Sequence, residues 1–366
     1  MKRQIGIVTL LFLMGCTPEP TNEGTEPPPA EESTRDESAT SEESNTTEEM
    51  ELNIGEVTAI AENLEIPWSL ARSADEWFVS ERGGTITVID DSGRATQSTV
   101  NLDEDVFEIG EGGLLGIALS DDFESSGILY AYHTYGSSGR DVKNRVVELT
   151  WDGERFEETG VLIDEIPGAR FHNGGRLLVD GAYLWVTTGD ALVPELAQDE
   201  SSLAGKILRI PLSGEGEPTD WIYSLGHRNP QGLSWMDDTL YASEHGASGH
   251  DEVNVIEEGN NYGWPLIEAN EEREGLVTPW FEVGETSWAP SGIATDERYV
   301  YMATLRNERL VAIDRETKQV TTIVEGVGRI RDVWLDDDTL YFISNNTDGR
   351  GNPQSQDDKL YQVTIR

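Results

Sequence analysis

Residues 226–265 hold side chains that could bind a charged ligand. Arg228 and Asn229 stand side by side near the start of this stretch, and the carboxylates Asp251 and Glu252 follow. An arginine presents a planar fork of donors to carboxylate or carbonyl oxygens, and Asp and Glu beside free carbonyls suit a hard cation such as calcium. Glycines and prolines between them mark tight turns in which the backbone can face a ligand. Any one of these pieces is compatible with an ordinary polar loop, but the whole array favours a binding site.

His172 is a candidate for acid–base chemistry. It opens the turn His-Asn-Gly-Gly at residues 172–175, whose two glycines would let the backbone approach a ligand closely. An imidazole titrates near neutral pH, which suits a general base. The chain holds five histidines, and a buried structural histidine is the usual alternative. Asp190, which follows a glycine, would on spacing alone be a turn residue.

A pair of arginines stands in Arg329-Ile330-Arg331. Their i,i+2 spacing places both guanidinium groups on one face of an extended segment. The alternative is a pair of surface salt bridges, because the chain has 70 Asp and Glu against 26 Lys and Arg, a formal net charge of −44. Such a surface repels nucleic acid and anionic lipid, and we expect neither as a partner.

Residues 1–16 have the pattern of a lipoprotein signal peptide. Lys2 and Arg3 precede an apolar run, and Leu-Met-Gly-Cys at residues 13–16 forms a cleavage box that ends in the one cysteine of the chain. The run is too short for a membrane-spanning helix, which needs about 20 residues. An ordinary secretory signal is the alternative. We expect an exported protein that is held in the cell envelope, on its periplasmic or extracellular face, by a lipid anchor on Cys16.

The rest of the chain divides into a tether and a domain. Residues 17–52 are rich in Glu, Thr, Ser and Pro and lack an apolar period. Such a segment cannot bury enough apolar surface to offset its ordering entropy, and we expect a disordered acidic tether. Motifs are spread evenly over residues 53–366, which favours one large domain over two small ones.

This domain repeats a unit made of an apolar strand, a polar turn with Asp or Gly, and a second strand with an aromatic residue. The copies lie at residues 69–80, 116–132, 176–188, 232–243, 292–304 and 331–344. Their spacing and the absence of long amphipathic helical patterns predict an all-β fold, a six-bladed β-propeller with four-stranded antiparallel blades. The strand patterns at residues 55–60 and 359–365 are expected to meet in one blade and close the ring.

Several short motifs run through this domain in addition to the array at residues 226–265. They are Pro67-Trp68-Ser69-Leu70, Gly110-Glu111-Gly112-Gly113-Leu114-Leu115-Gly116, His172-Asn173-Gly174-Gly175-Arg176-Leu177, Thr188-Gly189-Asp190, Ser202-Leu203-Ala204-Gly205-Lys206-Ile207-Leu208-Arg209, Ala289-Pro290-Ser291-Gly292 and Arg329-Ile330-Arg331-Asp332-Val333. In their order and types these motifs resemble the soluble quinoprotein glucose dehydrogenase and aldose sugar dehydrogenase family. The resemblance covers nearly everything after residue 53. Each motif alone is weak, but together they are highly specific.

The resemblance implies pyrroloquinoline quinone (PQQ), a tricarboxylate, as the cofactor and an aldose as the substrate. His172 matches the base that takes the proton of the C1 hydroxyl as hydride leaves C1, and Asp190 matches the carboxylate that orients it. Arg228 would also stabilise negative charge on the quinone, and Asn229 would hydrogen-bond the cofactor. The other cofactor-binding positions are Glu111, Arg306, Arg329 and Arg331. Electrons would pass to an external acceptor, namely a quinone, a cytochrome or a dye.

The resemblance also implies calcium (Ca2+) at two places. One ion would bridge the quinone and the backbone carbonyls of Gly246 and Ala247. The second would be structural and would use Glu252 and the Tyr262 region, there through a main-chain oxygen because a neutral phenol is a poor ligand. Carbonyl and carboxylate oxygens suit calcium better than zinc.

Three positions depart from the family pattern. Glu111 stands where the family commonly has a glutamine, and an ionised Glu beside a tricarboxylate would be repulsive. Arg306 replaces the usual lysine, which keeps the charge but changes the geometry. Ala247 replaces a frequent proline.

Two other functions remain open on the sequence. A calcium-dependent propeller hydrolase of the lactonase type would share the scaffold and the metal without needing the arginines. A non-catalytic propeller that binds glycan or protein would need neither His172 nor Arg228.

Overall fold

The computed structural model describes residues 52–366, which belong to one compact unit, Glu51–Arg366. The expected signal peptide at residues 1–16, with its Cys16, lies outside the described residues, as does the expected tether at residues 17–52 apart from its last residue. Among residues 52–366, no helix is long and apolar enough to cross a membrane. Besides strands, the unit has one short helix, α1 (Phe123–Ser126), and two 3-10 segments, Pro194–Gln198 and Pro218–Trp221.

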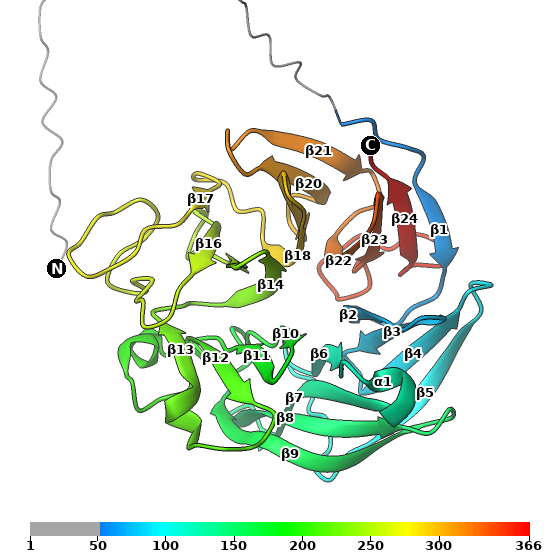
Figure 1. Ribbon diagram of the computed structural model, residues 1–366, viewed down its shortest axis with the longest axis horizontal. Helices are drawn as coiled ribbons and strands as arrows, with labels where there is room; N and C mark the ends of the chain where they lie inside the picture. Colours follow the sequence, from blue (N-terminus) through cyan, green and yellow to red (C-terminus); the bar gives the residue numbers. More distant parts are fainter. Residues whose placement is uncertain (1–51) are drawn as a thin grey trace, which may run out of the picture. The chain divides into compact units, whose positions relative to one another are not determined.

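The strands form sheets that stand around a common centre (Figure 1). Four of the sheets are antiparallel and have four strands each. In order across each sheet they are β1 (Thr58–Ala61), β24 (Leu360–Thr364), β23 (Thr339–Ser344) and β22 (Ile330–Asp336); β10 (Leu177–Asp180), β11 (Tyr183–Thr187), β12 (Lys206–Pro211) and β13 (Ile222–Leu225); β14 (Pro230–Met236), β15 (Thr239–Glu244), β16 (Glu252–Ile256) and β17 (Phe281–Glu282); and β18 (Pro290–Thr295), β19 (Tyr299–Thr304), β20 (Arg309–Asp314) and β21 (Val320–Glu325).

The fifth sheet has eight strands, where the sequence predicted separate four-stranded sheets. In order they are β2 (Pro67–Arg72), β3 (Glu76–Glu81), β4 (Thr85–Asp90), β5 (Ala95–Asn101), β9 (Phe156–Pro167), β8 (Asp141–Trp151), β7 (Ile128–Ser138) and β6 (Leu114–Leu119). The sheet consists of two antiparallel groups of four that join through a short parallel pairing, Val100 with Phe156 and Asn101 with Glu157. β7, β8 and β9 have 11 or 12 residues each, and the pairing joins the last two residues of β5 to the first two of β9.

The first and last strands pair with each other, as the sequence predicted. β1 runs antiparallel to β24, with Thr58 opposite Gln362 and Ala59 opposite Tyr361. The pairing continues outside the strands, because Gly55 N donates to Thr364 O at 2.8 Å and Arg366 N donates to Asn53 O at 3.0 Å. The two ends of the described chain therefore complete one four-stranded sheet, in which β1 covers the edge of β24.

The predicted aromatic positions recur at equivalent places in the fold. They lie on the second strand of each group, at Trp77-Phe78 in β3, Leu129-Tyr130 in β7, Leu184-Trp185 in β11, Leu240-Tyr241 in β15, Val300-Tyr301 in β19 and Leu340-Tyr341 in β23. All are buried except Tyr341, which is partly buried. The hydrophobic core lies between adjacent sheets, where these side chains pack. The repeat in the sequence thus reflects a repeat in packing.

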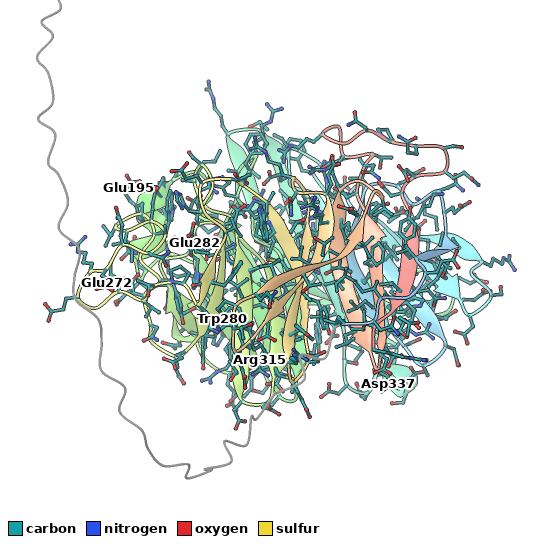
Figure 2. The ribbon with its side chains drawn as sticks, turned by 90° about the horizontal axis from the view of Figure 1, so that it is seen from above. Glu195, Glu272, Trp280, Glu282, Arg315 and Asp337 are labelled. Carbon is teal, nitrogen blue, oxygen red and sulfur yellow. The ribbon has the colours of Figure 1, made fainter. Side chains whose placement is uncertain are left out.

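The first strand of each group lies nearest the centre, and each contacts the first strand of the next group (Figure 1). Because the first and second strands are antiparallel, the loop that enters a first strand and the loop that leaves a second strand emerge on the same face. Every sequence-predicted site residue except Tyr262 lies in one of these loops or within two residues of one. Figure 2 places Glu195, from such a loop, and Asp337, from a loop of the other kind, at opposite ends of the unit.

Candidate functional site

His172 and Asp190 form a hydrogen-bonded pair. His172 Nδ1 lies 2.8 Å from Asp190 Oδ1, the histidine side chain is 16% exposed, and the carboxylate is 1% exposed. The carboxylate also accepts a hydrogen bond from the indole N–H of Trp264 at 2.9 Å and one from the backbone N–H of Leu192 at 2.9 Å. Because an ionised carboxylate only accepts, Nδ1 carries the proton of this hydrogen bond. In the neutral form of the ring, the second nitrogen, Nε2, then has a free lone pair.

The backbone around His172 is unusual. His172 has a φ of 61°, a left-handed conformation that is rare outside glycine and common at functional sites. The glycines that follow have a packing role, which the sequence did not predict. A Cβ on Gly174 would lie 2.7 Å from Thr187 O, and one on Gly175 would lie 2.8 Å from a methyl group of Leu115. These glycines let the turn pack against the rest of the protein.

Arg228 and Asn229 are tied to the same turn. Arg228 O accepts from Asp190 N at 2.8 Å, and Asn229 Oδ1 accepts from Gly174 N at 3.0 Å. The backbone N–H groups of Arg228 and Asn229 both donate to Oε1 of the buried Glu244. The Arg228 guanidinium donates to His245 O at 3.2 Å, while its buried Nε has no partner among the described residues. This guanidinium thus has no carboxylate partner.

Arginines from distant loops line one pocket of about 360 Å³. Its lining includes Arg306, Arg329, Arg331, Arg350 and Glu111. Arg331 is buried and donates only to neutral groups, among them Gln231 Oε1 at 2.9 Å and Asn345 Oδ1 at 3.2 Å. Burial and the neighbouring Arg329 lower the pKa of Arg331 to about 9, so it is still a cation at neutral pH. The sequence-predicted cluster is therefore assembled as a basic pocket.

The other arginines of this pocket differ in their partners. Arg329 forms an ion pair with Asp348 at 2.8 Å. The exposed side chain of Arg306 has no hydrogen-bond or ion-pair partner within residues 52–366. The sequence left open that Arg329 and Arg331 both form surface salt bridges. Within residues 52–366, Arg331 forms none. In a chain with a net charge of −44, cations without carboxylates are a notable exception.

Glu111 does not stand as an isolated negative charge. Its Oε1 pairs with Arg350 Nη1 at 2.7 Å, and its Oε2 accepts from the backbone N–H of His172 at 3.4 Å. Burial disfavours the ionised form, but His245, Arg350 and the His172 N–H outweigh it and hold the pKa of Glu111 below its ordinary value. The repulsion expected from this departure is thereby offset.

Gly246, Ala247, Glu252 and Tyr262 line one small pocket of about 30 Å³, which is close to the volume of a single water. Burial, with Glu244, Glu282 and Asp251 nearby, raises the pKa of Glu252 to about 8. The Tyr262 hydroxyl is engaged elsewhere, because it donates to Val255 O at 2.5 Å and accepts from Glu257 N at 3.0 Å.

Side chains alone do not complete a metal site in this pocket. Among residues 52–366, no group of three or more His, Cys, Asp or Glu side chains is arranged to hold a metal ion. A cation here would depend on main-chain oxygens together with Glu252. Calcium accepts such a ligand set more readily than zinc does.

Sequence reasoning missed four residues that the structure places at the site. Trp264 donates a hydrogen bond to Asp190, and Glu244 accepts one from the backbone N–H of Arg228. Arg350 pairs with Glu111. His245 lines both the basic pocket and the small pocket beside Glu252. The His245 Nε2 is buried without a partner in the described part of the chain, and burial lowers the pKa of His245. Trp264 and His245 lie within residues 226–265, where the glycines gave the stronger sequence signal. Arg350 lies in a loop with no periodic signal.

Comparison with known proteins places these features in context. A family model described as Glucose / Sorbosone dehydrogenase matches residues 64–354. The aldose sugar dehydrogenase YliI of Escherichia coli is 32% identical over 231 residues, which are 57% of this chain and 62% of that protein. Quinoprotein glucose dehydrogenase B of Acinetobacter calcoaceticus is 28% identical over 257 residues, 60% of this chain and 54% of that protein. These two alignments span less than two thirds of the relatives' length.

Solved structures match over more of their length. The PQQ-bound form of aldose sugar dehydrogenase from Streptomyces coelicolor is 38% identical with a TM-score of 0.77, over 85% of this chain and 98% of that one. The soluble aldose sugar dehydrogenase of Escherichia coli, in its apo form, is 25% identical with a TM-score of 0.73, over 86% of this chain and all of that one (100%).

Proposed function

The chain belongs to the glucose/sorbosone dehydrogenase family, and we propose that it oxidises the C1 hydroxyl of an aldose to the lactone with PQQ and calcium. Electrons would leave to an external acceptor. The observation that carries the proposal is a pocket whose guanidinium groups outnumber its carboxylates and which lies next to the His172–Asp190 pair. The PQQ-bound structure of a relative that matches over 98% of its length supports the choice of cofactor.

His172 is the proposed base. Its Nδ1 is committed to Asp190, so Nε2 takes the proton of the C1 hydroxyl. Asp190 holds the ring in the required tautomer and stabilises the imidazolium that forms. Trp264 and Leu192 in turn hold the carboxylate from two other directions, which keeps the pair aligned.

The basic pocket fits a tricarboxylate. Bound PQQ would supply an electrophilic ortho-quinone that accepts hydride from C1. Arg306 and Arg331 lack carboxylate partners in the described chain, so an anionic ligand would satisfy charges that the protein leaves open. Arg228 lines the neighbouring small pocket and donates to the backbone of His245, which lines both pockets. Its Nε, which has no partner among the described residues, suits negative charge that develops during the reaction. Asn229 keeps its Nδ2 for a ligand, because only its Oδ1 is engaged by the protein.

The calcium proposal rests on the donor set around Glu252. Burial, with the carboxylates of Glu244, Glu282 and Asp251 nearby, raises the pKa of Glu252, and a bound divalent ion would act in the opposite direction. Gly246 and Ala247 would contribute carbonyl oxygens, and the Tyr262 region a main-chain oxygen. All four residues line one small pocket, and we retain two ions, one at the carbonyls of Gly246 and Ala247 and a structural one at Glu252 and the Tyr262 region.

Architecture and location complete the proposal. We count β2–β5 and β6–β9 as separate blades, which gives a six-bladed propeller over residues 53–366. We retain the signal peptide at residues 1–16, the tether at 17–52 and the lipid anchor on Cys16 as proposals from the sequence. They imply an exported enzyme in the cell envelope.

Reconstitution tests the function. The purified protein is mixed with PQQ and calcium, an aldose is added, and a redox dye is followed. We expect dye reduction, and we expect His172→Asn to lower kcat by about 10²- to 10⁴-fold while PQQ still binds. Asparagine tolerates a left-handed backbone, so this variant removes the base and keeps the turn. Lactone hydrolysis without PQQ would support the hydrolase instead, and neither activity would support a binding protein.

A further inference from the structure

Glu111 is the one carboxylate among the residues that line the basic pocket. Its two oxygens face two different partners, the Arg350 guanidinium and the backbone N–H of His172. The side chain is 19% exposed, and that of Arg350 is 46% exposed. The ion pair therefore lies at the edge of the pocket, between its interior and solvent.

Arg350 reaches this position from far along the chain. It stands in the loop between β23 and β24 and is 239 residues from Glu111. Its guanidinium also lies 5.3 Å from the centre of the Phe171 ring, next to His172. The same side chain thus touches the carboxylate of the pocket and the segment that carries the proposed base.

The charge balance of the pocket depends on this contact. A carboxylate here would repel an anionic ligand at short range, and it would do so more strongly in a partly buried site than in water. Arg350 cancels that charge. If Arg350 were absent, Glu111 would lose its ion-pair partner among the described residues, and only His245 and the His172 N–H would offset its charge.

We propose that Arg350 is a specificity-determining residue of the cofactor site. By pairing with Glu111, Arg350 makes a carboxylate at position 111 compatible with a bound tricarboxylate. The inference rests on the proposed function. Glu111 in turn acts as a positioning residue, because it links Arg350 to the His172 turn. Loss of Arg350 should therefore weaken PQQ binding mainly through the charge of Glu111.

Binding of PQQ to the calcium-loaded protein tests the inference without turnover. Quenching of tryptophan fluorescence gives Kd for the wild type, Glu111→Gln, Arg350→Ala and the double variant. We expect Arg350→Ala to raise Kd at least 10-fold. Glu111→Gln should leave Kd unchanged or lower it, and the double variant should return to within about threefold of the wild type. Arg155→Ala is the matched control, because Arg155 is 59% exposed and pairs with carboxylates outside the pocket.

Two outcomes would overturn the inference. Arg350→Ala could bind PQQ like the wild type, which would place Arg350 outside the site. Alternatively, Glu111→Gln could fail to relieve the Arg350→Ala defect, which would trace the defect to the loop and not to the charge. Arg350→Lys separates these causes further, because it keeps the charge and should retain most of the affinity. A wild type that does not bind PQQ at all would instead refute the proposed function and the inference with it.

Discussion

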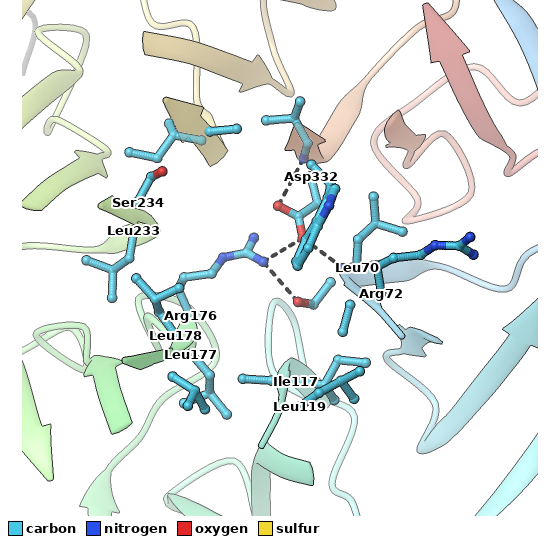
Figure 3. A pocket seen from close by; sticks show the side chains of 18 of the residues that line it. Leu70, Arg72, Ile117, Leu119, Arg176, Leu177, Leu178, Leu233, Ser234 and Asp332 are labelled. Carbon is cyan, nitrogen blue, oxygen red and sulfur yellow. Dashed lines mark hydrogen bonds and ion pairs between the residues drawn. The ribbon is translucent and has the colours of Figure 1, made fainter. Parts of the chain in front are cut away.

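The centre of the ring of sheets has two ends, or mouths, and the buried arginines at these two mouths have different partners. At the mouth opposite the proposed active site, a pocket of about 440 Å³ is walled by leucine, isoleucine and alanine side chains from the first strands (Figure 3). There Arg176 pairs with Asp332 at 2.6 Å and donates to Ser69 Oγ at 3.0 Å. At the mouth that holds the proposed active site, Arg331 is equally buried and, among residues 52–366, donates only to neutral acceptors.

Two residues separate these arginines. Gln231 accepts from Arg176 Nε through its backbone oxygen and from Arg331 Nη1 through its side chain. The indole of Trp68 lies 4.5 Å from the Arg176 guanidinium carbon and 5.8 Å from that of Arg331. The two arginines are alike in burial, and they differ in that Arg176 has a carboxylate partner. We infer that the paired arginine supports the fold, and the proposed function makes the unpaired one available to a ligand.

The largest effect is expected at the paired mouth. Asp332→Ala would leave Arg176 as an uncompensated buried charge and would also remove the acceptor of the Leu70 N–H. We expect a loss of about 3–5 kcal/mol in the free energy of unfolding, measured by urea denaturation. Asp121→Ala is the control, because Asp121 is exposed at the same mouth. A loss below 1 kcal/mol for Asp332→Ala would mean that the pair does not support the fold.

Calcium should stabilise the active-site mouth. At a concentration of 100 times Kd the expected gain is about 2.7 kcal/mol, visible as a rise in Tm. In the calcium-free protein the pKa of Glu252 is raised from its ordinary 4.5 to about 8. Its contribution to stability is therefore complete below pH 4.5 and is lost as the pH rises through 8.

The variant Glu252→Gln tests this pH dependence. It should remove the fall in Tm between pH 4.5 and 8 in EDTA, and it should weaken the response to calcium. Equal calcium responses in the wild type and the variant would exclude Glu252 from the ion site.

A smaller effect is expected where one hydrogen bond braces the catalytic pair. Trp264→Phe keeps an aromatic ring beside Arg228 but removes the indole N–H that donates to Asp190. We expect kcat to fall about tenfold, which corresponds to about 1.4 kcal/mol, while Kd for PQQ changes little. A proportional rise in Kd would show that Trp264 supports the cofactor and not the base.

The smallest effect is expected from the unpaired arginine in the absence of ligand. Arg331→Met removes a buried charge that has no carboxylate partner. The stability of the ligand-free protein should change by less than about 1 kcal/mol or should increase, because a buried charge is costly to retain. A loss as large as that of Asp332→Ala would erase the difference between the two mouths.

The sequence predicted the strands better than the partners of individual side chains. Aromatic residues recur in β3, β7, β11, β15, β19 and β23 because equivalent positions of these strands pack in the core. This repeat is therefore visible in the sequence. The pairing of β1 with β24 followed from the need to close an edge. The merging of two groups through β5 and β9 had no local signal, because it depends on where long strands end in space.

The same limit applies to the site. Family-like motifs predicted His172, Asp190 and the arginines as site residues, but they did not predict the close packing of Gly174 and Gly175 against the protein. The partner of Glu111 could not be predicted, since Arg350 lies 239 residues away. Nor could sequence distinguish the paired Arg176 from the unpaired Arg331. Which carboxylate meets which guanidinium is decided by tertiary packing.

The central claim is that guanidinium groups without carboxylate partners hold an anionic redox cofactor. Calorimetric titration of PQQ into the calcium-loaded wild type and into Arg331→Met tests it most directly. We predict one site per chain in the wild type and a Kd about 10- to 100-fold higher in the variant, with the folded state intact. Equal affinity in the two proteins would contradict the account.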